Sequence, residues 1–269
     1  MNTATVVMEE LATLRIERRG AAAWIILTRP ARRNAINAKL ISDLGKAIEM
    51  SRDSSIRAVV LTGTEDAFCA GADLTFVQSL EGSTEIVSKF LRPLTEVLGA
   101  IRELPKPVVA AINGHCVAGG VETALCCDLI IAAEDARIAD GHARFGLLPA
   151  IGGANLLARA LGPHKAKEML FTGDTYTGTQ LAELGLVNRA VPRENLEAVV
   201  TELVEKLCAR SPSGLALMKR MINDGASLPW PEAAELELTL TEAHLSTGDH
   251  EEGLAAFIER RTPVFGSIR

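Results

Sequence analysis

One glutamate lies in an unusual setting for an ionisable residue. The segment VAGGVETALCCD, residues 117–128, contains two adjacent glycines and is otherwise mostly small and apolar, yet it carries Glu122 in its middle. Burial among Val121, Leu125 and Cys126 would disfavour the charged carboxylate and raise its pKa, which suits a general acid or base. The alternative is that Glu122 lies exposed in the first turn of a helix and only complements the helix dipole. The glycines and the apolar neighbours favour the chemical role.

Two glycine-containing corners could hold a developing negative charge. The expected strand at residues 106–114 leads through HCVAGG into a helix whose first turn contains Gly119 and Gly120. Free backbone N–H groups at such a helix start attract a ligand oxygen. In the second corner, Gly71 and Ala72 follow FCA and precede another helix start. Packing explains either corner alone equally well, but together they predict an oxyanion hole built from backbone amides.

The elements expected around these corners change in type along the chain. Up to about residue 140, apolar or β-branched runs alternate with helical patterns, as in an α/β domain with parallel strands. Strands are expected at residues 21–27, 56–63, 106–114 and 128–133, and helices at 36–51 and 84–104, with Pro93 kinking or dividing the second. From about residue 193 the pattern is helical, with helices expected at 193–211, 212–225, 231–246 and 250–261. We therefore expect an α/β core at residues 1–192 and a helical C-terminal region at 193–269.

The composition argues against several classes of protein. The 269 residues are 48% hydrophobic, which is enough to build a globular core. A net charge of −6 without a basic stripe argues against nucleic-acid binding. The N-terminus lacks a signal sequence and no apolar run approaches the roughly 18 residues that span a bilayer, so no membrane association and a cytoplasmic location are expected. The five cysteines show no CxxC spacing, so neither disulfides nor a metal site is expected.

Four segments, by their order and spacing, resemble the crotonase superfamily, also called the enoyl-CoA hydratase/isomerase family. They are WIILTRPARRNAIN (24–37), AFCAGADL (67–74), AAINGHCVAGGVETALCCDLIIAAEDARI (110–138) and GLAAFIERRTPVFGS (253–267). The resemblance runs over nearly the whole chain. It implies an α/β fold with a crotonase-like spiral core of repeated ββα turns. It also implies that the C-terminal helices make homotrimer contacts and that trimers often pair into hexamers.

The resemblance also implies roles for individual residues. Members bind an acyl-coenzyme A whose thioester oxygen accepts hydrogen bonds from two backbone amides, which correspond here to Ala72 and Gly119. Glu122 corresponds to a catalytic glutamate of the hydratases. Phe265 corresponds to a position that closes over the coenzyme, often from a neighbouring subunit. Coenzyme A is thus part of the substrate, and no permanently bound cofactor is expected. The channel for it would be lined by Arg29, Ala35, Ala70, Ala72, Asp73 and Leu74.

One departure from the family pattern affects the chemistry. Hydratases of this family use a second glutamate later in the chain, ahead of a G-x-x-P turn. Here that stretch reads ADGHARFGLLPAIGG, residues 139–153, and His142 stands at the position of the glutamate. A neutral imidazole, with an ordinary pKa of about 6.5, could share the proton transfer as a second catalytic group. The alternative is a structural or site-lining histidine, with Asp140 as a partner that fixes its orientation.

Two hypotheses of different class follow. The first is an enzyme that acts on 2-enoyl-CoA thioesters through a stabilised enolate, with hydration as the named reaction and isomerisation, C–C cleavage or hydrolysis as alternatives. The second is an acyl-CoA binder without turnover, which only the missing second glutamate supports. A dinucleotide oxidoreductase is excluded because the G-x-G-x-x-G spacing is absent, and a serine hydrolase because no G-x-S-x-G elbow is present.

Overall fold

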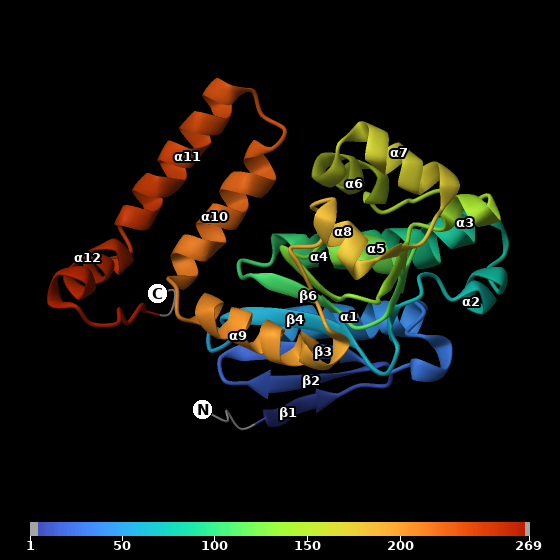
Figure 1. Cartoon of the computed structure of the whole chain (residues 1–269), viewed down its shortest axis with the longest axis horizontal. Coiled ribbons are helices and arrows are strands. Elements are labelled where there is room, and N and C mark those ends of the chain that lie inside the picture. Colours follow the sequence, from blue (N-terminus) through green and yellow to red (C-terminus); the bar gives the residue numbers. More distant parts are fainter. Residues whose placement is uncertain (1–4, 267–269) are drawn as a thin grey trace.

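The computed structural model describes residues 5–266, and its largest feature is a seven-stranded sheet (Figure 1). The strands, in the order in which they pair, are β1 (Thr5–Glu10), β2 (Leu14–Arg19), β3 (Ala22–Leu27), β4 (Ala58–Gly63), β6 (Val108–Ile112), β8 (Leu129–Ala133) and β11 (Arg189–Val191). Pairing is antiparallel from β1 to β3 and parallel from β3 to β11. The four strands expected from the sequence are β3, β4, β6 and β8, and they are confirmed. The carboxyl ends of β4, β6 and β8 therefore meet at one edge of the sheet.

A second sheet of short strands lies beyond that edge. It pairs β10 (Tyr176–Thr177), β9 (Arg137–Ala139), β7 (His115–Val117) and β5 (Ala67–Cys69) in this order. Strands β5, β7 and β9 follow directly after β4, β6 and β8 in the chain. Each repeat of the fold therefore places one strand in the large sheet and the next in the small sheet, and helices follow. The predicted spiral core of ββα turns is thereby confirmed. Each turn of the spiral brings the segment after its short strand to the same side of the molecule.

Helices cover both faces of the large sheet. The helices up to residue 208, of which α1, α4 and α9 pack on the large sheet, are α1 (Ala38–Met50), α2 (Leu74–Gln78), α3 (Gly82–Ile86), α4 (Arg92–Glu103), α5 (Gly119–Leu125), α6 (Gly153–Leu161), α7 (Pro163–Thr172), α8 (Gly178–Glu183) and α9 (Leu196–Cys208). One core cluster packs the sheet against α1 and α4, and a second packs its other face against α9. Strand β3 contributes to both clusters, so all six of its residues are buried. Burial on both faces explains why the sequence of β3 is apolar at every position.

Pro93 divides the long helix expected at residues 84–104. The chain forms α3, then a π-helical turn at Val87–Leu91, and then α4, in which Pro93 lies at the first turn. Proline has no N–H, so it cannot donate to the carbonyl of Lys89 four residues earlier. The wider π turn before Pro93 accommodates the missing bond. The predicted interruption is confirmed.

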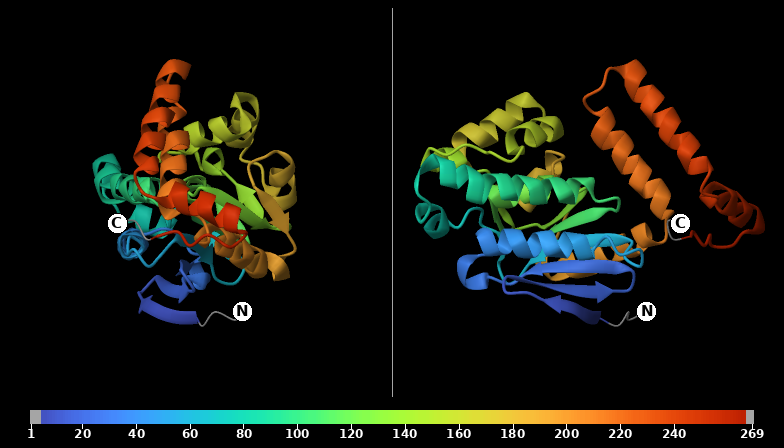
Figure 2. Two further views of the ribbon diagram at one scale, coloured as in Figure 1. Left: turned by 90° about the vertical axis from the view of Figure 1, so that its left-hand side faces the viewer. Right: turned by 180° about the vertical axis from the view of Figure 1, so that it is seen from behind.

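The last three helices extend away from the sheets (Figures 1 and 2). Helix α10 (Pro212–Gly225) and α11 (Trp230–Leu245) lie side by side, and α12 (Asp249–Glu259) follows at their base. All the expected C-terminal helices are present within a few residues of their predicted bounds. The division of the chain at residue 193 stays a prediction, and residues 1–4 and 267–269 of the two regions lie outside the described part. Among residues 5–266, no helix combines the length and the hydropathy that crossing a bilayer requires.

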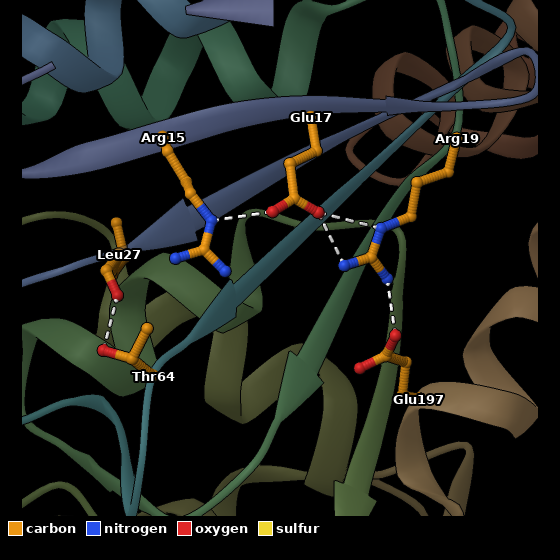
Figure 3. A network of polar contacts seen from close by, with 6 residues as sticks. All are labelled: Arg15, Glu17, Arg19, Leu27, Thr64 and Glu197. Carbon is orange, nitrogen blue, oxygen red and sulfur yellow. Dashed lines mark hydrogen bonds and ion pairs between the residues drawn. The ribbon is translucent and has the colours of Figure 1, made fainter. Parts of the chain in front are cut away.

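A polar network joins β2 to α9 on the face of the large sheet that α9 covers (Figure 3). The carboxylate of Glu17 lies between Arg15 and Arg19, at 2.7 and 2.6 Å, and Arg19 also contacts Glu197 of α9 at 2.8 Å. The guanidinium of Arg19 lies 4.1 Å from the ring centroid of Trp24. Burial raises the pKa of Glu17, but the hydrogen bonds and charges of the two arginines outweigh it, so the pKa lies below its ordinary value.

Replacing Glu17 should destabilise the fold. Glu17→Gln removes the carboxylate between two arginines and should lower the free energy of unfolding by about 2 kcal/mol at pH 7. Since the folded-state pKa is below the ordinary value of 4.5, this stabilisation is present above pH 4.5 and is lost as the pH falls through the folded-state pKa. Urea unfolding at neutral and acidic pH should therefore show the difference from wild type shrinking in acid.

The matched control is Glu49→Gln. Glu49 also pairs with an arginine, Arg52, but its side chain is 77% exposed. Exposed pairs contribute little, so this variant should change stability by less than about 0.5 kcal/mol. Equal effects of the two substitutions would contradict the interpretation of the network.

Candidate active site

The backbone turns sharply at two corresponding places in the spiral. Gly71, after β5, has a φ of 86°, and Ala118, after β7, has a φ of 50° and a ψ of −116°. Such angles are uncommon for a residue with a side chain and persist only where the surroundings fix them. At Ala118 the surroundings include a 2.9 Å hydrogen bond from its amide to the carbonyl of Ala139. The two turns set the direction of the amides that follow, which belong to Ala72 and Gly119.

The amides of Ala72 and Gly119 lie close together, and neither has a hydrogen-bond acceptor among residues 5–266. The bridge between residues 36 and 72 uses the amides of Ile36 and Asp73, at 2.7 and 2.8 Å, and leaves that of Ala72 unused. Gly119 is the first residue of α5, where an amide has no acceptor within the helix. A Cβ atom on Gly119 would lie 3.9 Å from the nitrogen of Ala72. The structure thus brings together the two residues predicted to form the oxyanion hole.

Glycines allow these two segments to approach each other. A Cβ on Gly120 would lie 2.2 Å from the carbonyl oxygen of Cys69, and one on Gly71 would lie 2.8 Å from that of Val117. Real Cβ atoms do not approach backbone oxygens so closely, so a side chain at either glycine would force the two corners apart. The paired glycines of the sequence therefore serve close packing as well as the free amides.

Glu122 lies in the first turn of α5 and is only 2% exposed. Its Oε1 accepts hydrogen bonds from the amides of Ile151 and Gly153, at 2.9 and 3.3 Å. Burial raises the pKa of Glu122 and outweighs the opposing effects of these amides and of the charge of His142. The predicted buried carboxylate is confirmed, and the alternative of an exposed first turn is wrong.

The two amides that hold Glu122 were not predicted. Ile151 and Gly153 act through the backbone, so the types of their side chains carry no signal. A Cβ on Gly153 would lie 2.8 Å from the Glu122 side chain, which explains why the position holds glycine. The pair Gly152–Gly153 at the start of α6 resembles the pair Gly119–Gly120 at the start of α5, and this was the available signal in the sequence.

His142 lies next to Glu122 and is joined to Asp140. Its Nε2 is 4.0 Å from Oε2 of Glu122, and its Nδ1 is 3.0 Å from both carboxylate oxygens of Asp140. Burial lowers the pKa of His142, but the hydrogen bond and charge of Asp140, together with the charge of Glu122, outweigh it and leave the pKa above its ordinary value. The predicted nearness to Glu122 and the predicted partner Asp140 are both confirmed. The surroundings of His142 thus favour the protonated imidazole more than water does.

The predicted channel segments are joined through one ion pair. Arg29 contacts Asp73, at 3.0 Å between Nη2 and Oδ2, and also donates to the carbonyl of Ala35. The amide of Ala70 donates to the carbonyl of Arg33 at 2.9 Å. Leu74, which begins α2, is half-exposed. These residues lie together beside Ala72, and their contact with a coenzyme stays a prediction.

Phe265 lies apart from the other predicted residues within this chain. Its carbonyl accepts a 2.8 Å hydrogen bond from Arg57, which immediately precedes β4. Because β4 runs from Arg57 towards the site, Phe265 lies at the amino ends of the parallel strands and the site lies beyond their carboxyl ends. A role for Phe265 over the coenzyme of a neighbouring subunit stays a prediction.

The remaining ionisable and thiol groups near the core form no further centre. Within residues 5–266, no three His, Cys, Asp or Glu side chains gather where they could hold a metal ion. The five cysteines are free thiols, and burial raises the pKa of Cys69 to about 12 and that of Cys126 to about 11. These thiols behave as small apolar groups.

Comparison with known proteins shows similarity along nearly the whole chain. A family model described as "Enoyl-CoA hydratase/isomerase" matches residues 17–268. A mitochondrial enoyl-CoA hydratase of Pongo abelii is 34% identical, over 93% of this chain and 86% of that protein. A crotonyl-CoA hydratase of Syntrophomonas wolfei is 31% identical, over 93% and 96%. The crystal structure of an enoyl-CoA hydratase from Bacillus anthracis covers 100% of both chains at 31% identity, with a TM-score of 0.89.

Adding a methyl group at Gly120 should disturb the two corners. Gly120→Ala would place its Cβ against the backbone of Cys69, so we expect a loss of roughly 1–3 kcal/mol in unfolding free energy, measured by thermal or urea unfolding. The matched control is Gly99→Ala in α4, where a Cβ would meet nothing within 4 Å. The control should be neutral or stabilise by roughly 0.5–1 kcal/mol. Unchanged stability in Gly120→Ala would show that the corners are not closely packed.

Proposed function

This chain belongs to the enoyl-CoA hydratase/isomerase family, and on that premise we propose that it adds water across the double bond of 2-enoyl-CoA thioesters. The observation that carries the proposal is the pairing of Glu122 with His142, 4.0 Å apart, beside two free backbone amides. Hydration through an enolate requires two proton-transfer groups and a place for one negative oxygen. The site offers all three.

The amides of Ala72 and Gly119 would bind the thioester oxygen. When a nucleophile adds to C3 of an enoyl thioester, negative charge moves to that oxygen and an enolate forms. Donors that are already oriented stabilise this charge without reorganising during the reaction. Because Gly119 begins α5, the positive end of the helix dipole adds to the effect.

Glu122 and His142 would hold the water that reacts. Oε1 of Glu122 is occupied by two amides, whereas Oε2 faces Nε2 of His142 across 4.0 Å. That separation is too long for a direct hydrogen bond, but one water about 2.8 Å from each atom would bridge them. Such a water lies between a base and an acid, next to the expected position of the substrate double bond.

The proton transfers then balance. Glu122 takes one proton from the water as the oxygen attacks C3, and the electrons of the C2=C3 bond form the enolate. His142, as an imidazolium, gives its proton to C2, which yields the 3-hydroxyacyl thioester. Return of the proton from Glu122 to His142 restores the site. Coenzyme A enters only as part of the substrate, and no bound cofactor or metal takes part.

The presence of both groups favours hydration over the alternatives. Isomerisation needs one group that moves a proton between two carbons and needs no bound water. C–C cleavage or hydrolysis by the same site, or binding without turnover, would leave the Glu122–His142 pair without its bridging role. The cytoplasmic location expected from the N-terminus stays a prediction.

We also propose that α10–α12 bind other copies of the chain. Apolar side chains on these helices are strongly exposed, with Trp230 at 79% and Phe257 at 84%. Exposed patches of this kind mark protein contacts. A homotrimer, or a hexamer of two trimers, remains the assembly that the resemblance to the family implies.

Removing the charge of Glu122 should abolish hydration. Glu122→Gln keeps the side-chain volume but removes the base, so kcat should fall by about 10²- to 10⁴-fold with little change in KM. The assay follows the loss of conjugated-thioester absorbance across a panel of 2-enoyl-CoA substrates. Glu17→Gln, also a buried glutamate, lies on the opposite face of the sheet and should keep wild-type kcat. Wild-type turnover by Glu122→Gln would contradict the proposal, as would a wild-type protein that binds the thioesters without hydrating them.

Charges on α12 should disrupt assembly. Light scattering of the wild-type protein should give three or six times the chain mass of 28.7 kDa. Phe257→Glu combined with Ile258→Glu should lower this mass, because charged groups would be buried in the contact. Glu251→Lys, a change at an exposed charged position of the same helix, is the control and should leave the mass unchanged. A monomeric wild-type protein would exclude the proposed assembly.

A further inference from the structure

We propose that Asp140 is a positioning residue, which fixes the orientation and the tautomer of His142 so that Nε2 faces Glu122 and the reacting water. The catalytic role of this positioning rests on the proposed function, whereas the contact between Asp140 and His142 does not depend on that function. Asp140 would touch no substrate. It would act only through the imidazole.

The carboxylate of Asp140 is buried and is directed at one residue. It accepts a 3.2 Å hydrogen bond from the amide of His142, and both of its oxygens lie 3.0 Å from Nδ1 of the same residue. No other donor in residues 5–266 contacts this carboxylate. The turn that makes this possible passes through Gly141, which has a φ of 71°. A buried carboxylate is stable only with donors, so the imidazole is held in this position.

The contact determines which nitrogen carries the proton. A neutral imidazole has one N–H, and a carboxylate can only accept, so the proton must lie on Nδ1. Nε2 is then the atom with a free lone pair, and any second proton is gained or lost there. Since Nε2 faces Glu122, proton exchange is confined to the side of the ring where the water would lie.

His115 shows the contrast within the same molecule. Its nearest carboxylate, that of Asp66, is exposed and lies 3.8 Å from Nε2. Burial lowers the pKa of His115, and nearby arginines add to this effect, so that the weak attraction of Asp66 does not reverse it. At His142 the buried, close carboxylate of Asp140, together with the charge of Glu122, reverses the effect of burial on the pKa.

The same charge also decides which group of the pair is protonated. The charged groups that act on His142 are Asp140 and Glu122, and those that act on Glu122 are His142 and Asp140. Asp140 contacts the imidazole directly and reaches Glu122 only through its charge, so its carboxylate favours the proton on His142 over the proton on Glu122. Replacing Asp140 removes that preference.

The experiment is magic-angle-spinning ¹⁵N NMR of the whole protein labelled at histidine, recorded over a range of pH. The signals of His142 are identified by their loss in His142→Gln. In the wild type we expect neutral His142 to carry its proton on Nδ1 and to titrate at higher pH than His115. In Asp140→Asn we expect the midpoint to fall by about one pH unit or more and the Nε2–H tautomer to appear.

Asp43→Asn is the matched control. Asp43 is also a buried carboxylate, which binds Thr13 and Lys39 far from His142, so its replacement should destabilise the fold and leave the His142 spectrum unchanged. A wild-type His142 protonated on Nε2 when neutral would overturn the proposal, and this result needs no variant to fold. An unchanged midpoint and tautomer in Asp140→Asn would overturn it equally.

Kinetics then separate this inference from the proposed function. Asp140→Asn should lower kcat and move its pH profile to lower pH without a matching change in KM, and it should have no further effect in a His142→Ala background. Additive losses in the double variant would contradict a role through His142. If the NMR result holds but the wild type hydrates no enoyl-CoA, the proposed function fails and the positioning by Asp140 stands.

Discussion

The site depends on how the carboxylate of Glu122 is held in the interior. Two amides from the start of α6 bind one of its oxygens, and no donor within residues 5–266 binds the other directly. A fully satisfied carboxylate would be a structural anchor, and an unsatisfied one would not stay ionised when buried. In the proposed reaction, this half-satisfied carboxylate would be a base that is fixed in direction and still able to accept a proton. The charge of a protonated His142 would lower its pKa and so favour its ionised form.

The spiral of ββα turns makes that arrangement by bringing distant segments to one edge. Parallel strands end at the same side, so the corners after β5 and β7 and the turn after β9 all open there. The close approach of the corners needs glycine at positions 71 and 120, and the free amides of Ala72 and Gly119 follow from the unusual backbone angles before them. In the proposed reaction, the backbone would provide the electrostatic stabilisation and side chains would be needed only for proton transfer. On this proposal, a histidine can stand where the resemblance to the family implies a second glutamate, because only its proton transfer is required.

The sequence predicted the elements with strong periodicity and the residues with local signals. Helices α10 and α11 each have a proline in the first turn, and Glu122 is marked by its glycines and apolar neighbours. The strands of the small sheet contain two or three residues each, too few for a period to show. The amides of Ile151 and Gly153 act without their side chains, and the position of Phe265 depends on a contact with Arg57 more than 200 residues away. These features arise from long-range packing, which no local pattern encodes.

The central claim is that one water, held between Glu122 and His142, adds across the C2=C3 bond of an enoyl-CoA. Its most direct test is mass spectrometry of the product formed in ¹⁸O-labelled water and, separately, in deuterium oxide. The account predicts one ¹⁸O at C3 and one deuterium at C2 for each molecule converted. Deuterium in the acyl chain without any ¹⁸O would contradict it, because the site would then move protons between carbons and not add water.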